Sequence, residues 1–572
     1  MFEPKKSRRQ TAPSRAMRGV LTGSKCLLGC AALSLSIASA ASAPAGGAAF
    51  CDLTRAPDAV SVVTEQDATN LAAVSPGQWE GLGVTVATRS ESGGLGVELK
   101  APAAAVKHLR LHWNLAAPTG WKYLGDDWER AYGDLEWKPM ESAGTLAWYF
   151  LATDGTTTHG YGVMTGASAM CAWFADTNGI TLDADVRCGG MGVQLGARTL
   201  KVGVIVCRQG LEHETPFQAA QSFCRVMCPK PRLPRQPVFG FNDWYCSYGK
   251  DTSEKLLSNI TFVVSLAPKN GNLPYAVVDD GWQVKGDLGG TNGPGQWFRT
   301  SPSFSSNLTM PEFAKLVRAA GARPGIWVRP LIASRDQPAG WRLARRRDYL
   351  DPTVPEVRAY VREVMGRLHG WGFELIKHDY STYDITGQWE SSGQKEVTRD
   401  GWAFADRSRT TAEVIRAFYQ DIRDGAGDDA VILGCNTIGH LSAGIFEMQR
   451  IGDDTSGQEW ARTRKMGVNC LAFRAPQHGT FFAVDGDCAG QTSANSVPWE
   501  KNSQWLDLLA RSGTPLFVSF PHDTVSPEQT EALRKALTAA AGPQKLAEPL
   551  DWLDSKTPSH WLLNGQEAHF TW

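Results

Sequence analysis

The chain has 572 residues, with 58 basic and 59 acidic side chains and a formal net charge of -1 at pH 7. This length is enough for two or three domains. The charge balance gives no basis for a nucleic-acid partner or for an anionic membrane surface. The 21 tryptophans suit a protein that stacks sugars on aromatic rings, and they equally suit a large β-rich core.

The N-terminus has the pattern of an export signal. Basic residues up to Lys25 precede an apolar segment from Cys26 to about Ala38, and two Ala-Ser-Ala sequences end at Ala40 and Ala43. The apolar segment is too short for a stable transmembrane helix. We therefore predict that residues 1–43 are a signal peptide and that the mature protein is secreted or periplasmic, with no membrane partner.

Ten cysteines follow this signal, and an even number in an oxidising compartment is typical of a protein with disulfides. We expect some disulfides, although the sequence leaves their pairing open. The ten are Cys51, Cys171, Cys188, Cys207, Cys224, Cys228, Cys246, Cys435, Cys470 and Cys488.

Residues 51–230 contain short stretches of alternating apolar and polar residues, broken by Gly, Pro, Asn and Asp. Examples are His108–Trp113, Thr145–Leu151 and Lys201–Val206. This pattern predicts an antiparallel β-sandwich. A helical segment beginning at Pro216 leads to the proline-rich stretch Pro229–Pro237, where we place the domain boundary.

Residues 237–542 change to a repeated strand, loop and helix pattern, which predicts a (β/α)8 TIM barrel. A doubly wound sheet is the alternative, but it usually carries a glycine-rich phosphate turn after its first strand, and none is present. Residues 543–572 are predicted to form a short C-terminal β segment. The expected barrel strands are Val238–Trp244, Tyr275–Asp279, Pro324–Val328, Glu374–Asp379, Val431–Cys435, Glu447–Gly452, Phe481–Asp485 and Pro515–Phe520.

Three of the expected helices have capping-box starts, at Thr309, Thr353 and Ser526. The connection after the fifth strand, from Thr437 to Ile445, is short enough to hold only one turn of helix.

Polar residues, mainly acids, follow the predicted strands at their carboxyl ends, which is where a barrel builds its site. Acids and tryptophans without a histidine cluster favour a sugar site over a metal or phosphate site. We predict no metal and no cofactor. Hard-oxygen metal binding by Asp279, Asp280, Asp453 and Asp487 remains the alternative.

Two carboxylates suffice for glycoside hydrolysis, one as nucleophile or base and one as proton donor. Lys377 and Asp379 lie two apart on one strand and so share a face. Asp379 is the better nucleophile because a nearby cation holds a carboxylate ionised. Asp453 adjoins Asp454, and crowding of like charges raises one pKa of such a pair, which suits a proton donor.

These residues resemble glycoside hydrolase clan D, which holds the family 27 and family 36 α-galactosidases. The resemblance covers roughly residues 237 to 520 and rests on five motifs in order: Phe241-Asn-Asp-Trp244, Asp279-Asp-Gly-Trp282, Gly325-Ile-Trp327, Lys377-His-Asp379 and Gly452-Asp453. It implies a retaining double displacement with Asp379 as nucleophile and Asp453 as acid/base.

The same resemblance implies the sugar-binding residues. Asp279 and Asp280 would bind the C4 and C6 hydroxyls of galactose, and Lys377 would bind its C3/C4 side. Trp244 would line the −1 subsite. The remaining candidates are Trp327, Asn436 in the region of C2 recognition, and Arg450 and Asp487, which would contact ring hydroxyls or support the acid/base.

His378 and Tyr380 depart from the usual sequence pattern of the family, and these residues are candidates for determining sugar specificity. The predicted substrate is an oligosaccharide or polysaccharide with a terminal α-galactosyl unit. α-N-acetylgalactosamine and β-L-arabinopyranose stay open as other glycones. A galactosyl transferase of the raffinose-synthase kind and a non-catalytic carbohydrate-binding protein stay open as other functions.

Overall fold

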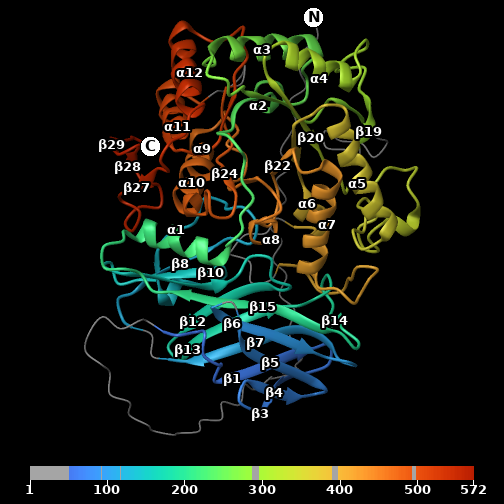
Figure 1. The fold of residues 1–572 in the computed structure, drawn as a ribbon, viewed down its shortest axis with the longest axis vertical. Coiled ribbons are helices and arrows are strands. Elements are labelled where there is room, and N and C mark those ends of the chain that lie inside the picture. Colours follow the sequence, from blue (N-terminus) through green and yellow to red (C-terminus); the bar gives the residue numbers. More distant parts are fainter. Residues whose placement is uncertain (1–50, 92, 116–117, 286–294, 389–396, 492–496) are drawn as a thin grey trace, which may run out of the picture. The chain divides into compact units, whose positions relative to one another are not determined.

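The computed structural model describes residues 51–572 apart from 92, 116–117, 286–294, 389–396 and 492–496. These residues belong to one compact unit, in which an antiparallel sheet is followed by a parallel sheet with its helices (Figure 1). Within this described part, no helix combines the length and the apolar character that crossing a membrane requires. The predicted signal peptide, residues 1–43, lies outside the described residues.

The first half forms one continuous antiparallel sheet of fifteen strands. The antiparallel prediction is confirmed, but the strands are hydrogen-bonded into a single sheet instead of the two separate sheets of the predicted sandwich. Its strands are β1 (Ala59–Thr64), β2 (Ala68–Asn70), β3 (Ala72–Ser75), β4 (Gln78–Gly81), β5 (Val84–Glu91), β6 (Gly94–Lys100), β7 (Ala105–Asn114), β8 (Lys122–Asp126), β9 (Lys138–Pro139), β10 (Leu146–Thr153), β11 (Thr158–Val163), β12 (Met170–Asp176), β13 (Gly179–Asp185), β14 (Val193–Gln194) and β15 (Thr199–Arg208).

Strand β7 shows why this segment folds as a sheet. Its side chains alternate, so Leu109, Leu111 and Trp113 are buried while the residues between them are more exposed. The strand pairs with β1 on one side and β13 on the other, which satisfies its backbone groups on both edges.

The second half contains a parallel sheet whose strands match the eight predicted positions. Strand β16 pairs with both β17 and β26, so the first strand adjoins the last. The strands are β16 (Phe239–Asn242), β17 (Tyr275–Val278), β20 (Arg323–Val328), β21 (Leu375–His378), β22 (Val431–Gly434), β23 (Met448–Arg450), β24 (Ala483–Asp485), β25 (Cys488–Gly490) and β26 (Leu516–Ser519).

The seventh position differs from the prediction because its strand is split. β24 pairs with β23, and β25 pairs with β26. Between them lie Gly486 and Asp487, and Asp487 has a φ of 72°, a conformation rarely adopted by residues other than glycine. The break therefore falls at one of the predicted site residues.

Helices follow the parallel strands and surround them (Figure 1). The helix α1 (Pro216–Met227) comes before the barrel strands and packs on β11 and β15. The others are α2 (Trp244–Ser247), α3 (Ser253–Leu266), α4 (Met310–Ala319), α5 (Pro355–Gly370), α6 (Ser381–Thr386), α7 (Thr411–Ala426), α8 (Gly439–Ser442), α9 (Trp460–Thr463), α10 (Cys470–Arg474), α11 (Trp499–Arg511) and α12 (Pro527–Ala540).

Smaller elements complete the chain. A π-helical segment spans Arg464–Asn469, and 3-10 turns span Met140–Ser142, Ala339–Trp341 and Ala475–Gln477. The hairpin β18 (Gln283–Lys285) and β19 (Gly295–Thr300) follows β17. The predicted C-terminal β segment is a three-stranded antiparallel sheet of β27 (Glu548–Pro549), β28 (His560–Leu563) and β29 (Gln566–His569).

Most of the predicted helix starts are confirmed. Thr309 and Ser526 form capping boxes at α4 and α12, and α8 is the single turn expected after the fifth strand. The capping box at Thr353 is wrong, because the residue that caps α5 is Val354. The Thr353 hydroxyl donates instead to Asp351 Oδ1 at 2.6 Å.

The expected disulfides are not formed in this structure. All ten cysteines from Cys51 to Cys488 are free thiols, and seven of them are buried. Cys435 and Cys488 lie among the charged residues at the carboxyl end of the parallel sheet, where burial raises their thiol pKa well above the usual value.

A buried ion pair joins the antiparallel sheet to the barrel. Arg474 in α10 donates from Nε to Asp126 Oδ1 at 2.7 Å and from Nη2 to Oδ2 at 3.0 Å, and Gln477 donates to Oδ2 at 2.7 Å. Arg474 is 1% exposed and Asp126 is 3% exposed. Removal of one partner would leave the other charge unpaired in a place that water cannot reach.

We therefore predict that Arg474→Met lowers the free energy of unfolding by about 3–5 kcal/mol. Arg511→Met is the matched control, because the pair that Arg511 forms with Asp507 is partly exposed and is worth less than about 1 kcal/mol. Urea denaturation of both variants measures the difference. Equal losses in the two variants would contradict the role given to the Arg474–Asp126 pair.

Candidate active site

The carboxyl ends of β17 and β21 are joined by a buried ion pair. Lys377 Nζ donates to Asp279 Oδ2 at 2.6 Å, and Asn242 Nδ2, at the end of β16, donates to the same oxygen at 2.8 Å. Burial alone would lower the pKa of Lys377, but the Asp279 carboxylate outweighs it and raises that pKa well above the usual value. Lys377 therefore stays charged at neutral pH.

Asp379 follows directly after β21 and is half-buried. Its Oδ2 accepts a hydrogen bond from Trp327 Nε1 at 3.2 Å, and its Oδ1 accepts one from the Tyr380 amide at 2.7 Å. Burial acts to raise the pKa of this carboxyl, but the charges of Lys377 and Arg130 more than compensate and leave it below its usual value. Asp379 is thus an ionised carboxylate, as the sequence predicts.

Asp453, after β23, is held by two arginines. Arg130 Nη2 lies 2.7 Å from its Oδ1, and Arg462 Nη2 donates to its Oδ2 at 2.6 Å. Burial raises the pKa of Asp453, but Arg130 and Arg462 outweigh burial and lower it below the usual value. The raised pKa expected for one member of the Asp453–Asp454 pair therefore does not fall on Asp453, the predicted proton donor. The raised pKa belongs to Asp454, where burial is the main cause.

Arg130 comes from the antiparallel domain and was missed by the sequence reasoning. Its segment is docked on the barrel by a parallel bridge, in which the Ala131 amide donates to the Ile451 carbonyl at 2.7 Å. Gly452, the partner of Ala131 in this bridge, lets the π-helical segment pack closely, because a Cβ there would lie 2.0 Å from the Met466 carbonyl oxygen. Arg130 is 4% exposed, and its charge acts on both Asp379 and Asp453.

Asn436, which is predicted to contact the substrate, also secures the same segment. Its Nδ2 donates to Glu129 Oε1 at 2.5 Å, and the Tyr132 hydroxyl donates to that oxygen at 2.9 Å. Asn436 and Glu129 are both fully buried. Asn436 thus binds the segment that carries Arg130, and its contact with the substrate stays a prediction.

Arg450 and Asp487 form a second buried pair that supports the acid-bearing loop. Arg450 Nη1 lies 3.1 Å from Asp487 Oδ1, and Arg450 Nη2 donates to Asp454 Oδ1 at 3.1 Å. Asp487 Oδ2 accepts the Tyr245 hydroxyl and the Thr455 amide. These bonds hold Asp487 in its left-handed conformation and fix the loop that carries Asp453.

The other predicted residues lie at the same end of the sheet. Asp280 is buried, and Gln283 Nε2 donates to its Oδ1 at 2.5 Å. Trp327 is buried and binds Asp379, whereas Trp244 at the start of α2 is half-buried and contacts the Tyr248 ring edge-on. These residues therefore lie at the same end of the sheet as Asp379, and their contact with a sugar stays a prediction.

His378 faces away from this set. Its ring is fully buried, contacts Phe446 and Tyr419, and has Nδ1 2.8 Å from the Ser381 hydroxyl. It alternates with Lys377 and Asp379 along the chain and so occupies the opposite face of the strand. The hypothesis that His378 chooses the sugar is therefore wrong. Tyr380 is half-buried beneath the Arg329 guanidinium, 4.0 Å from its ring centroid.

The four carboxylates of the alternative metal site already have protein partners. Lys377 binds Asp279, Gln283 binds Asp280, Arg130 binds Asp453 and Arg450 binds Asp487. Three of these partners are cations, and they lie where a metal ion would add further positive charge. This donor set does not fit a hard cation, and it does fit hydroxyl groups, which hydrogen-bond to acids and bases alike.

Fold and site together describe a protein with an antiparallel sheet and a parallel half-barrel sheet, which carries carboxylates at its carboxyl end and receives an arginine from the antiparallel part. No protein-family model matches the chain. Solved structures of α-galactosidases do have a similar fold.

The α-galactosidase of Thermus thermophilus, in complex with p-nitrophenyl α-D-galactopyranoside, matches with a TM-score of 0.57 and 15% identity, over 85% of this chain and 97% of its own. A GH36 α-galactosidase variant from Geobacillus stearothermophilus, in complex with 1-deoxygalactonojirimycin, matches with a TM-score of 0.54 and 12% identity, over 84% of this chain and 75% of its own. These likenesses show that the chain has the fold of these enzymes.

The burial of His378 predicts a loss of stability in mild acid. Burial lowers the pKa of its imidazole to about 3, whereas in an unfolded chain it is about 6.5. Between these values only the unfolded chain takes up the proton, so stability falls as the pH falls from about 6.5 toward 3. From pH 7 to pH 5 this single group lowers the free energy of unfolding by about 2 kcal/mol.

Urea denaturation of the wild-type protein and of His378→Gln at both pH values checks this. The variant lacks the titrating group and should lose about 2 kcal/mol less than the wild type over that range. Parallel losses in the two proteins would show that His378 is not a buried neutral imidazole.

Proposed function

We propose that this protein is a retaining glycoside hydrolase that removes terminal α-galactosyl residues, or residues of a similar axial-C4 sugar, from oligosaccharides or polysaccharides. The observation that carries the proposal is the Asp379 carboxylate, held ionised by Lys377 and Arg130, with Asp453 bound to the same arginine. Neighbours of similar fold are α-galactosidases, and some of their structures contain stachyose or raffinose.

In the first step, an Asp379 oxygen attacks the anomeric carbon while Asp453 gives its proton to the departing glycosidic oxygen. The bond to the aglycone breaks, and an ester bond between Asp379 and the sugar forms. In the second step, Asp453 takes a proton from water, and the water oxygen displaces Asp379. Two inversions restore the original anomeric configuration.

Arg130 and Lys377 serve the first step by stabilising the nucleophile as an anion. Arg130, together with Arg462, has the opposite effect on the proton donor, because a carboxyl next to two arginines gives up its proton at a lower pH than usual. The alkaline limb of the wild-type activity profile, where Asp453 loses its proton, should therefore lie on the acid side of neutrality.

The same geometry supports roles for the surrounding residues. Asp279, Asp280 and Lys377 would bind hydroxyls on one side of the sugar, and Trp244 and Trp327 would lie against its apolar face. Arg450 and Asp487 would hold the Asp453 loop, and Asn436 would position Arg130 through Glu129. Each of the last three acts through another residue.

Asp379→Gly should lower turnover of p-nitrophenyl α-galactoside by about a thousandfold or more, because no other group on the strand can form the ester. Added azide should restore part of the turnover and yield β-galactosyl azide, since the small anion occupies the emptied space. Asp429→Asn removes an exposed carboxylate far from the site and should leave turnover unchanged. Full activity in Asp379→Gly would rule out this nucleophile.

Arg462→Gln tests the assignment of Asp453 as proton donor. Loss of one neighbouring positive charge raises the pKa of Asp453, so the alkaline limb of the kcat/KM profile should move upward by about 1 pH unit. Lys535→Gln removes an equal charge from an exposed helix position and should leave the limb in place. A limb that does not move in Arg462→Gln would assign the proton donor to another group.

A screen of nitrophenyl glycosides across sugars and anomers would identify the glycone among α-galactose, α-N-acetylgalactosamine and β-L-arabinopyranose. Product analysis with and without sucrose as acceptor would separate hydrolysis from transfer, because a transferase makes acceptor-dependent products with little free sugar.

We also propose export of the protein through the signal at residues 1–43. Expression with its own N-terminus should give a mature chain that begins after Ala40 or Ala43, which N-terminal sequencing of the secreted or periplasmic protein would detect.

A further inference from the structure

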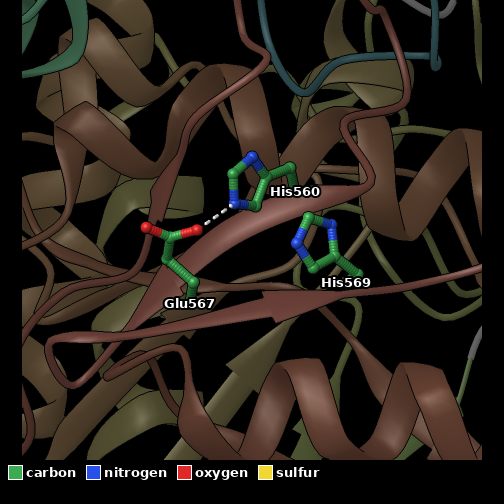
Figure 2. A group of neighbouring side chains, drawn as sticks. All are labelled: His560, Glu567 and His569. Atoms are coloured by element: carbon green, nitrogen blue, oxygen red, sulfur yellow. Dashed lines mark hydrogen bonds and ion pairs between the residues drawn. The ribbon is translucent and has the colours of Figure 1, made fainter.

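The C-terminal hairpin carries two histidines and a glutamate on one face (Figure 2). His560 on β28 lies directly opposite His569 on β29 in the antiparallel register. Glu567 precedes His569 by two residues, and residues two apart on a strand share a face. All three side chains are therefore brought together by the hairpin alone.

The side chains lie close enough to share one ion. The His560 and His569 rings are stacked with centroids 4.1 Å apart, and His560 Nε2 is 2.8 Å from Glu567 Oε2. One ligand atom from each of the three residues lies within 4.8 Å of the other two, and no other such cluster occurs among the described residues. Glu567 and His569 are exposed and His560 is half-buried, so an ion can enter from solvent.

We propose that His560, Glu567 and His569 form a binding site for a divalent transition-metal ion, and for Zn²⁺ in particular. Two imidazole nitrogens and one carboxylate oxygen are ligands that Zn²⁺ prefers, and a water molecule would complete a tetrahedral set. Zinc–ligand bonds of about 2.0–2.2 Å require ligand atoms roughly 3.3 Å apart. Small rotations of these side chains would close the set around the ion.

The hairpin supplies a rigid frame for these ligands. Its turn consists of Asn564 and Gly565, both with positive φ, which is the backbone of a tight two-residue hairpin. On the opposite face, Trp561 and Leu563 are buried in the hydrophobic core. The histidines therefore hold a fixed cross-strand distance, and binding costs little ordering of the backbone.

The alternative is that the hydrogen bond between His560 and Glu567 is only a surface contact that stabilises the hairpin, which is common for cross-strand pairs. That alternative gives no role to His569. Its ring stacks on His560, and among the described residues its side chain forms no hydrogen bond. A metal ion engages all three residues, and this difference can be measured.

A bound ion would fix strand β29. The chain runs on from β29 to Phe570 and Trp572, and the Trp572 ring contacts Trp460 of α9 at 5.9 Å between centroids. We therefore assign the site a structural role at the C-terminus, independent of the proposed hydrolysis.

Isothermal titration of the full-length protein with zinc sulfate tests the site. The wild type should bind one equivalent of Zn²⁺, and its Tm should rise with added zinc. His569→Ala should weaken binding at least about tenfold and abolish the rise in Tm, and the more conservative Glu567→Gln should weaken binding in the same direction. His213→Ala removes an exposed histidine elsewhere and should bind zinc as the wild type does.

Cobalt substitution separates this site from the cysteines. Bound Co²⁺ should give the visible bands of a tetrahedral nitrogen and oxygen site without a thiolate charge-transfer band. The proposal is overturned if the wild type binds no zinc at millimolar concentration, if His560→Ala/His569→Ala binds it with wild-type affinity, or if the cobalt spectrum shows thiolate ligands.

Discussion

The ion pair between Arg130 and Asp453 is the contact on which the rest of the site depends. It brings a buried cation from the antiparallel domain to the carboxyl end of the parallel sheet, where the charge also acts on Asp379. A buried charge is costly unless it is paired. The position of the front domain and the ionisation of both carboxylates are therefore coupled through one side chain.

The surrounding polar groups form a set of buried pairs rather than a loose ring of acids. Two ion pairs join residues from different strands or strand ends. They are Lys377 with Asp279, and Arg450 with Asp487. Such pairs contribute little net stability, because desolvation offsets their attraction, but they fix the positions of the groups that bear them. Asp485, which lies near Arg450 and Asp487, has its carboxyl pKa raised by burial to about 6. Fixed geometry and shifted pKa values in one place are what catalysis by paired carboxylates needs.

The sequence predicts the strands of the barrel and most of the site because both depend on local pattern. Alternating motifs such as Lys377-His-Asp379 place their charged residues at a strand end with no long-range information. Arg130 could not be found in this way, since it lies more than three hundred residues before Asp453 in a domain without a catalytic pattern. Its only local signal is the acidic and aromatic cluster around Trp128.

The same limit explains the wrong expectations. The sequence relates the pKa of Asp453 to its neighbour Asp454. Two arginines that do not adjoin it in sequence, Arg130 and Arg462, have the larger effect on that pKa. The motif alone places His378 beside the charged residues, whereas the alternation of the strand turns its ring toward Tyr419 of α7 and toward Phe446. The single continuous antiparallel sheet likewise depends on pairings between remote strands.

The most direct test of this account is chemical trapping of the sugar on the enzyme. Incubation with 5-fluoro-α-D-galactosyl fluoride, which slows the second displacement, should add one fluorogalactosyl group to the intact protein. Peptide mass spectrometry should place that group on Asp379. A label on any other residue, or an unlabelled protein that still hydrolyses α-galactosides, would contradict the claim that Asp379 is the nucleophile of a retaining mechanism.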